Sequence, residues 1–536
     1  MLPIPLRAVL ALTIALTSSI HLTLAYPHKD HPNSILAQTR YGNRTLLGTS
    51  TFTQPIDHKN PSLGNFSQFY YWSDEHWAGP GSPVIMFTPG EANVTGYNSY
   101  LTLNRTTGVV AREIGAAVVV VEHRYWGVSS PFANLSTDNL QYLTLENSIA
   151  DFVRFAKEAK LPFDVQGNNN ADNAPWLFVG GSYSGALAAW IESISPGTFW
   201  AYWASSAPVQ SMDYWQYFVP VQQGMPKNCS ADVTKVVDYV DQVGYTGSEE
   251  EKKAFQTRFG LGNLEHYEDF ASALQNGPWL WQGNQFYQNS GFYDFCDAVE
   301  GADTPSSNNS SIVRIPTAEG VGVEKAVAGY ARWVNETMLP GFCASYGYAE
   351  WQGPYNTKCF DTHDPASPLF TDWSLSNQFD RQWVWMTCNE PFGYWQDAAP
   401  RDRPSIVSRF VNEKYWTRQC GLFFPEVAGE TYGIAKGKTY DDVNEYTGGW
   451  NIDNSTRLLH VNGQFDPWRE ASVASDFRPL GPLQSIEKVP TRLVPGGFHT
   501  SDLVTRNGVV NAAAKEIIDQ GVQIMAEWVK QWPAGK

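Results

Sequence analysis

A short segment around residue 180 constrains the fold more than any other part of this 536-residue chain. The apolar residues 176–179 lead into Gly-Gly-Ser-Tyr-Ser-Gly at residues 180–185, and the apolar residues 186–190 follow directly. A buried strand that passes through small residues into a helix predicts a sharp turn with Ser182 exposed above a sheet, as in a nucleophile elbow. A glycine-rich turn of a nucleotide-binding fold is the structural alternative, because Ser184 stands where the Gly-x-Ser-x-Gly pattern has glycine.

Other apolar runs indicate that this strand belongs to a mainly parallel sheet. Residues 145–156 and 514–529 carry apolar side chains at helical spacing, and Thr144 is available as the N-cap of the first helix. Strands that alternate with helices predict an α/β layered fold. The runs with the composition of buried strands are residues 83–87, 116–121, 176–179, 199–204, 458–461 and 492–494.

The strand pattern stops after Pro208 and resumes only near Arg457. In between, segments such as residues 235–243 and 325–338 have helical character, and the polar residues 302–311 predict a surface loop. We therefore expect a core made of residues 26–211 and 374–536. A mostly helical cap, residues 212–373, would be inserted into that core.

Two residues late in the chain are candidate partners for Ser182. Asp466 lies just after the predicted strand at 458–461, and His499 follows the strand at 492–494, whereas His460 lies within a strand and is expected in the core. The order Ser, Asp, His is that of α/β hydrolases. We therefore predict that Ser182 is the nucleophile, His499 the general base and then acid, and Asp466 the residue that orients the imidazole. Taken alone, Asp466-Pro467 is better explained as the start of a turn, and it is the order and placement of all three residues that favour the triad.

An oxyanion hole is predicted from two backbone N–H groups. One would come from Tyr183, the residue after the nucleophile, and the other from Gly90 or Glu91 in the loop that follows the strand at 83–87. A simple strand-ending turn explains Pro89-Gly90 just as well.

The N-terminus predicts export. Arg7 precedes an apolar run at residues 8–16, and small residues lead to Ala25, so we expect residues 1–25 to be a secretory signal peptide rather than a membrane anchor. The mature protein would be secreted, or delivered to a vacuole or lysosome. Sequons for N-glycosylation then become meaningful; they occur at Asn43, Asn65, Asn93, Asn104, Asn134, Asn228, Asn308, Asn309, Asn335 and Asn454.

The cysteines also indicate an exported protein. Their even number predicts disulfides in an oxidising environment, although the spacing leaves the pairing open. No two of them have the short spacing of a zinc knuckle, so no metal site is expected. The six are Cys229, Cys296, Cys343, Cys359, Cys388 and Cys420.

The formal charge of −17 excludes some classes of partner. Nucleic acids and anionic membranes would repel such a chain, so neither is expected to bind it. The sequence leaves the oligomeric state open.

With these residues in hand, the chain resembles the serine peptidase family that contains lysosomal Pro-X carboxypeptidase, dipeptidyl peptidase II and the secreted fungal acid prolyl endopeptidases. It is most similar to the last group. Beyond the Ser182 hexapeptide, the likeness rests on Phe87–Glu91, Glu122–Gly127, Gln141–Leu145, Asn462–Trp468 and Gly496–His499.

The resemblance implies an α/β-hydrolase core with a helical, disulfide-bearing cap, no cofactor, and peptide substrates that are cleaved on the carboxyl side of proline. It also implies that Trp468 lines a proline pocket, where aromatic walls can recognise a ring that has no N–H; the structural alternative is that Trp468 is core. Some relatives have a second histidine where this chain has Thr500, so no role is carried over to that position.

We expect a prolyl endopeptidase active at acid pH. An exo-acting Pro-X carboxypeptidase or dipeptidyl peptidase is the first alternative, and a carboxylesterase or lipase on the same fold is the second. A binding protein that kept the fold without catalysis is a third, which the complete Ser-Asp-His set disfavours.

Overall fold

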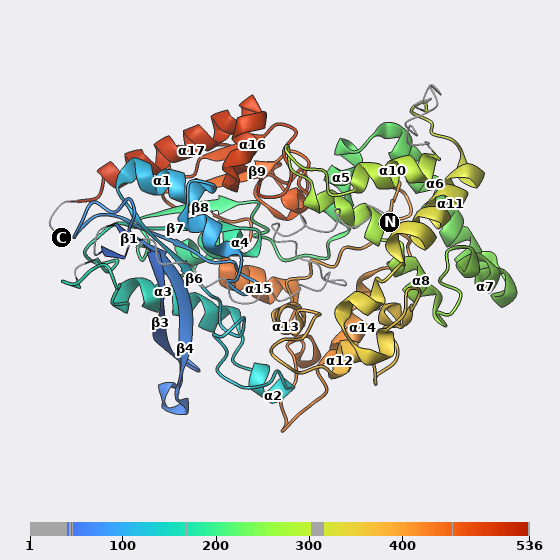
Figure 1. The fold of residues 1–536 in the computed structure, drawn as a ribbon, viewed down its shortest axis with the longest axis horizontal. Helices are drawn as coiled ribbons and strands as arrows, with labels where there is room; N and C mark the ends of the chain where they lie inside the picture. The colour runs from blue at the N-terminus through green and yellow to red at the C-terminus, as the bar shows by residue number, and fades with distance from the viewer. Residues whose placement is uncertain are drawn as a thin grey trace, which may run out of the picture.

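The computed structural model describes residues 40–41, 44–45, 47–167, 169–301, 316–452 and 454–533. The predicted signal peptide, the polar stretch 302–311 and the sequons at Asn43, Asn308 and Asn309 lie outside these residues. Figure 1 shows two parts, one built around a β-sheet and the other made of helices.

The sheet has eight strands in the order β10-β9-β8-β7-β5-β6-β4-β3. Six neighbours from β10 to β6 run parallel, and β4 and β3 pair antiparallel at one edge. All six predicted strands are confirmed. The bounds are β3 Leu47–Pro55, β4 Asn65–Ser73, β5 Val84–Phe87, β6 Ala117–Val121, β7 Trp176–Gly181, β8 Ala201–Ser205, β9 Leu458–Gly463 and β10 Thr491–Val494; the short pair β1 Arg40–Tyr41 and β2 Arg44–Thr45 lies apart.

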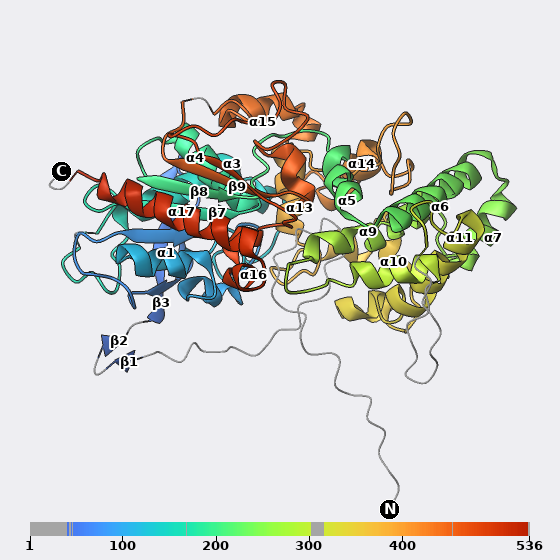
Figure 2. The same cartoon turned by 90° about the horizontal axis from the view of Figure 1, so that it is seen from above.

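Helices cover both faces of the sheet (Figure 2). Val84 and Met86 of β5 pack in the cluster that contains α3 (Leu145–Glu158) and α4 (Tyr183–Ile194), whereas Ile85 and Phe87 pack in the cluster of α1 (Thr106–Ile114) and α17 (Ala512–Lys530). Alternate residues of a strand point to opposite faces, so a strand covered on both sides must be apolar throughout. This explains why the parallel strands could be predicted as continuous apolar runs.

The antiparallel strands β3, at the edge, and β4, beside it, were not predicted. Their buried residues alternate with more exposed ones, as in Asn65–Ser73, and their apolar residues are interspersed with polar ones apart from Phe69–Trp72. An edge strand pair packed on one face leaves polar residues on the other, and its pattern is weaker than that of a buried strand.

The helical part is inserted between β8 and β9, and among the described residues it contains no named strand. Helical segments continue past residue 373, the predicted end of the cap, as far as α15. The bounds of its helices are α5 Phe218–Gly224, α6 Lys227–Thr246, α7 Glu249–Arg258, α8 Tyr267–Ala273, α9 Asn276–Trp279, α10 Phe292–Glu300, α11 Val323–Trp333, α12 Pro368–Thr371, α13 Arg381–Asn389, α14 Glu413–Phe423 and α15 Tyr440–Thr447. Two further helices, α2 Thr137–Leu140 and α16 Thr505–Val510, lie outside the insertion.

Three disulfides join helices and turns of this part. They pair Cys229 with Cys296, Cys343 with Cys359, and Cys388 with Cys420, which uses every cysteine in the chain. The prediction of disulfides is confirmed, and the structure supplies the pairing.

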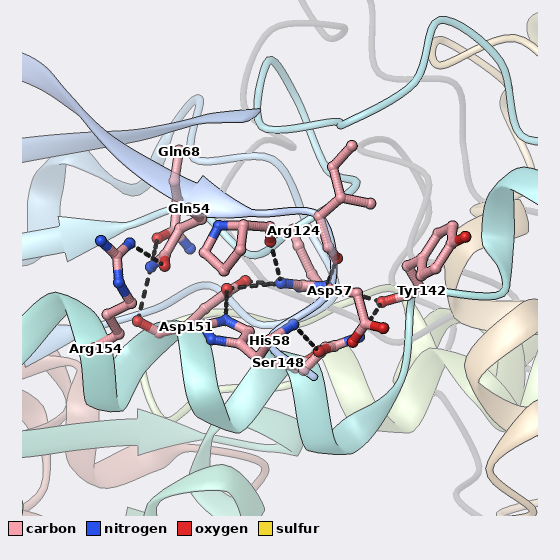
Figure 3. A network of polar contacts seen from close by, with 12 residues as sticks. Gln54, Asp57, His58, Gln68, Arg124, Tyr142, Ser148, Asp151 and Arg154 are labelled. Carbon is pink, nitrogen blue, oxygen red and sulfur yellow. Dashed lines mark hydrogen bonds and ion pairs between the residues drawn. The ribbon is translucent and has the colours of Figure 1, made fainter. Parts of the chain in front are cut away.

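A buried ion pair fastens the antiparallel edge to α3 (Figure 3). Arg124, in the turn after β6, donates from Nε and Nη2 to the two carboxylate oxygens of Asp151 at 2.7 Å each. The same guanidinium donates to the carbonyls of Pro55, Ile56 and Tyr142. Burial alone would raise the pKa of Asp151, but the charge and hydrogen bonds of Arg124, with those of His58, hold the pKa below its ordinary value. The motif residue Arg124 therefore has a structural role.

Within the described residues, no helix is long and apolar enough to span a membrane.

Candidate active site

Ser182 sits on a sharp turn between β7 and α4. Its φ of +60° lies in the left-handed region, and its N–H donates to Ser205 O of β8 at 3.0 Å. A non-glycine residue there is strained, and such strain is found where the surrounding structure fixes a functional side chain. The predicted elbow is therefore present, and Ser182 is the N-cap residue of α4.

The neighbours of Ser182 explain the altered motif. A Cβ on Gly180 would lie 1.9 Å from Ser184 O, and one on Gly185 would lie 2.5 Å from Ser205 O, so both positions need glycine. Ser184 has room for its side chain, and its hydroxyl accepts from Gly181 N at 2.9 Å and donates to Gly181 O at 2.8 Å. Ser184 therefore braces the turn where simpler elbows have glycine.

The predicted acid and base are hydrogen-bonded to each other. His499 Nδ1 and Asp466 Oδ1 are 2.9 Å apart, and both side chains are buried. Trp468 N also donates to Asp466 Oδ1, at 3.0 Å, which fixes the carboxylate. Since a carboxylate can only accept, Nδ1 of His499 carries the proton and Nε2 is left with a free lone pair when the ring is neutral.

The loop of His499 packs against the elbow. A Cβ on Gly181 would lie 2.9 Å from Thr500 Cγ2, so the residue after the histidine meets the residue before the serine. Thr500 N donates to Ser206 Oγ at 2.8 Å, and both Thr500 and Ser206 have positive φ. Among the described residues, neither Ser182 Oγ nor His499 Nε2 has a hydrogen-bond partner. The structure thus places the three predicted residues, Ser182, Asp466 and His499, beyond the carboxyl ends of parallel strands β7, β9 and β10.

The predicted oxyanion loop also reaches the elbow. Gly90 has φ +76°, and a Cβ there would lie 3.2 Å from the ring of Tyr183 and 3.4 Å from Ser184 N. Tyr183 is the first residue of α4, so its N–H has no acceptor within the helix. The N–H of Gly90 donates to Thr88 Oγ1 at 3.2 Å, and the N–H of Glu91 interacts with the carboxyl of its own side chain, so both residues remain candidates for the second donor.

Two buried carboxyl groups lie beside this loop. Burial raises the pKa of Glu91 to about 8, with a smaller contribution from Asp380, and burial raises the pKa of Asp380 to about 7. Trp126 Nε1 donates to Asp380 Oδ1 at 2.9 Å. Burial raises the pKa of the Tyr183 phenol and Glu91 raises it further, so Glu91 lies near the residue that follows Ser182. Below about pH 7 both carboxyl groups are mostly uncharged.

Trp468 has no exposed surface. It stacks on Tyr214 with ring centroids 5.3 Å apart, and the edges of Tyr217 and Tyr394 complete an aromatic cage. For Trp468 to contact a substrate, one of these rings would have to move. His460 is buried as predicted, and burial lowers its pKa to about 3.

Two residues that the sequence pattern did not predict hold the His499 loop. Asp502 accepts from Ser205 Oγ at 2.6 Å and from Trp203 Nε1 at 2.8 Å, and Gln285 Nε2 donates to His499 O at 2.9 Å. The position of Asp502 three residues after the histidine was a usable signal. Nothing in the sequence points to Gln285, which lies in the inserted helical part.

Seven predicted glycosylation sites lie in the described part of the chain. Asn65, Asn93, Asn104, Asn134 and Asn454 are exposed. Asn228 and Asn335 are half-buried, and the side-chain nitrogen of Asn335 donates to Ala331 O and Arg258 O. The exposed asparagines are therefore the more accessible acceptors.

Two side-chain groups in the helical part have the composition of metal ligands. They are His266, Glu268 and His363, and Asp269, Asp361 and His363. His363 already contacts Glu268 Oε1 at 3.2 Å and Asp269 Oδ2 at 3.0 Å, so ion pairing accounts for these contacts. In the described part of the chain, none of these residues is hydrogen-bonded or ion-paired to Ser182, Asp466 or His499.

Comparison with known sequences identifies relatives over the whole length. The chain is 43% identical to the "Serine protease vicPa" of Bipolaris victoriae, covering 95% of this chain and 94% of that protein. It is 30% identical to the "Probable extracellular serine carboxypeptidase" of Arthroderma benhamiae, covering 94% and 70%. It is 29% identical to the human "Lysosomal Pro-X carboxypeptidase", covering 98% and 96%.

Among solved structures, the proline iminopeptidase of Mycobacterium smegmatis matches with a TM-score of 0.36 and 10% identity, covering 90% of this chain and 100% of that one. The sequence model described as "Serine carboxypeptidase S28" matches residues 54–507, which include the elbow, Asp466 and His499. The α/β-hydrolase core with its helical cap, and a match of this extent, make the chain a serine peptidase of the S28 family.

Proposed function

We propose that this protein is a secreted endopeptidase that cleaves peptides on the carboxyl side of proline, with Ser182, His499 and Asp466 as its catalytic triad. The observation that carries the proposal is the buried Asp466–His499 hydrogen bond of 2.9 Å beside a serine held at positive φ.

The chemistry follows from these positions. His499 Nε2 accepts the proton of Ser182 as its oxygen attacks the substrate carbonyl, and Asp466 stabilises the imidazolium that forms. The N–H group of Tyr183 and that of Gly90 or Glu91 then donate to the tetrahedral oxyanion. His499 returns the proton to the leaving amine, and a water molecule repeats the sequence to release the acyl group.

Proline specificity is supported by two observations. A relative that the chain matches over nearly its full length is named a Pro-X carboxypeptidase. The loop of Asp466 also carries the aromatic cage around Trp468, which is closed in the structure and would admit a proline ring only after one of the tyrosines moved; aromatic surfaces suit an apolar ring that has no N–H to donate.

Activity at acid pH is supported by the buried carboxyl of Glu91. With its pKa raised to about 8, it stays uncharged across the acid range and does not oppose the developing oxyanion. Export is supported by the N-terminal signal-peptide pattern and by a relative named extracellular.

The test compares blocked chromogenic peptides that differ only in having proline or alanine before the scissile bond, together with a fatty acyl ester. We expect kcat/KM for proline to exceed that for alanine by at least about 100-fold, as an apolar pocket that fits one ring can provide. Efficient hydrolysis of the ester with slow hydrolysis of both peptides would contradict the proposal and favour a carboxylesterase.

Exo-acting cleavage is a second candidate, favoured by the description of the family as serine carboxypeptidases. A peptide blocked at both ends distinguishes the two, because an exopeptidase needs a free terminus. Cleavage of the doubly blocked peptide indicates an endopeptidase.

A further inference from the structure

One segment of the helical cap contacts both loops that carry the proposed acid and base. We call residues 281–286 the cap arm; it follows α9 and begins within the 3-10 turn Leu280–Gly283. Its side chains Trp281, Gln282 and Gln285 are buried. Their contacts are therefore made inside the protein, where a hydrogen bond is not replaced easily by water.

The first contacts of the cap arm lie on either side of Asp466. Trp281 Nε1 donates to Phe465 O at 2.8 Å, immediately before the acid. Gln282 Oε1 accepts from Trp468 Nε1 at 3.0 Å, two residues after it. The loop that presents Asp466 is thus held by the cap as well as by the sheet.

The next contact reaches the base. Gln285 Nε2 donates to His499 O at 2.9 Å, and Gln285 Oε1 accepts from Asn507 Nδ2 at 2.6 Å. A backbone N–H can only donate, and Phe286 N is bonded to Asn507 Oδ1 at 3.1 Å. This fixes which way both amides face, so Gln285 must present its N–H group to the His499 carbonyl.

His499 is therefore held from two directions. The core fixes its ring through Asp466 and the following peptide N–H through Ser206. The cap fixes its carbonyl through Gln285. Displacement of a catalytic group by about 1 Å can lower a rate about 100-fold, so the hydrogen bond from the cap arm is placed where it affects rate.

We propose that Gln285 is a positioning residue for the reaction, and that the cap arm sets the place of His499 relative to Ser182. The proposal rests on the triad assigned above. It makes the cap a part of the catalytic apparatus in addition to any role as a lid over the substrate.

The test measures the rate at which a fluorophosphonate labels Ser182, between pH 4 and pH 8, in three variants. Gln285→Leu removes the donor. Gln285→Glu keeps an O–H donor while the carboxyl is protonated and loses it on ionisation. Gln288→Leu is the matched control, because Gln288 lies on the same turn and bonds Gln285 through its backbone.

We expect Gln285→Leu to be labelled about 10- to 100-fold more slowly than wild type at every pH. Gln285→Glu should approach the wild-type rate at pH 4, and its rate relative to wild type should fall as the pH rises through the pKa of the new carboxyl. The control should be labelled within about 2-fold of wild type. With peptide substrate, the loss should be in kcat, with little change in KM.

A folded Gln285→Leu that is labelled within 2-fold of wild type would overturn the proposal. If that variant does not fold, Gln285→Glu decides: a labelling ratio that is constant with pH overturns the proposal, and a falling ratio supports it. Failure of the triad assignment is a separate result, since wild type itself would then not be labelled at Ser182.

Discussion

At the scale of single residues, burial favours the uncharged form of the carboxyl groups that lie beside the Ser182 turn. Glu91 is buried, its Oε2 has no hydrogen-bond partner among the described residues, and its pKa is raised to about 8. A carboxyl whose pKa is higher in the folded than in the unfolded state contributes stability that is complete below the unfolded value. That contribution is lost as the pH rises.

The first prediction concerns Glu91→Gln. In wild type, the contribution of Glu91 should decline between about pH 4.5, its ordinary pKa, and about pH 8. The amide of the variant does not titrate. The melting temperature of the variant minus that of wild type should therefore increase as the pH rises through this range. Thermal unfolding at pH 4 and pH 8 measures the difference. The exposed Glu75→Gln is the control, and an equal gain in both variants would contradict the prediction.

At the scale of elements, the Arg124–Asp151 pair joins the end of β3, the turn after β6 and α3. Both side chains are buried, and the arginine also donates to the carbonyls of the consecutive residues Pro55 and Ile56 and to that of Tyr142. Removing one partner of such a pair leaves a buried charge without compensation.

We predict that Asp151→Ala lowers the free energy of unfolding by about 3 to 5 kcal/mol. Glu158→Ala removes the half-exposed partner of Arg154 on the same helix, and should lower it by less than about 1 kcal/mol. Urea denaturation of the two variants checks both values. Equal effects would mean that the network in Figure 3 is not what fastens this edge.

The secondary-structure elements differ in how well the sequence predicts them. Parallel strands covered on both faces are apolar throughout and were predicted, whereas the alternating β3 and β4 were not. The order of Ser182, Asp466 and His499 could be recognised because each follows a predictable strand. Gln285 could not, because its role depends on a contact 214 residues away in sequence that no local pattern reports.

At the scale of the whole molecule, the disulfides all lie in the helical part that supplies the cap arm. The chain between Cys229 and Cys296 spans 67 residues, and that between Cys343 and Cys359 spans 16. A longer closed loop restricts the unfolded chain more strongly.

We predict that Cys229→Ser with Cys296→Ser lowers the free energy of unfolding by about 4 kcal/mol, and Cys343→Ser with Cys359→Ser by about 3 kcal/mol. Because the cap arm contacts the loops of Asp466 and His499, the first pair of substitutions should also slow the labelling of Ser182 at temperatures where the core remains folded. Denaturation curves together with labelling rates measure both effects. Unchanged labelling in a partly unfolded cap would show that cap and core act independently.

The most direct test of the central claim is to digest a long peptide that contains several prolines and to determine the termini of all products by mass spectrometry. We predict that each new C-terminus is proline, that internal fragments appear, and that Ser182→Ala gives no products although it folds. Cleavage after other residues, or cleavage by Ser182→Ala, would contradict the account.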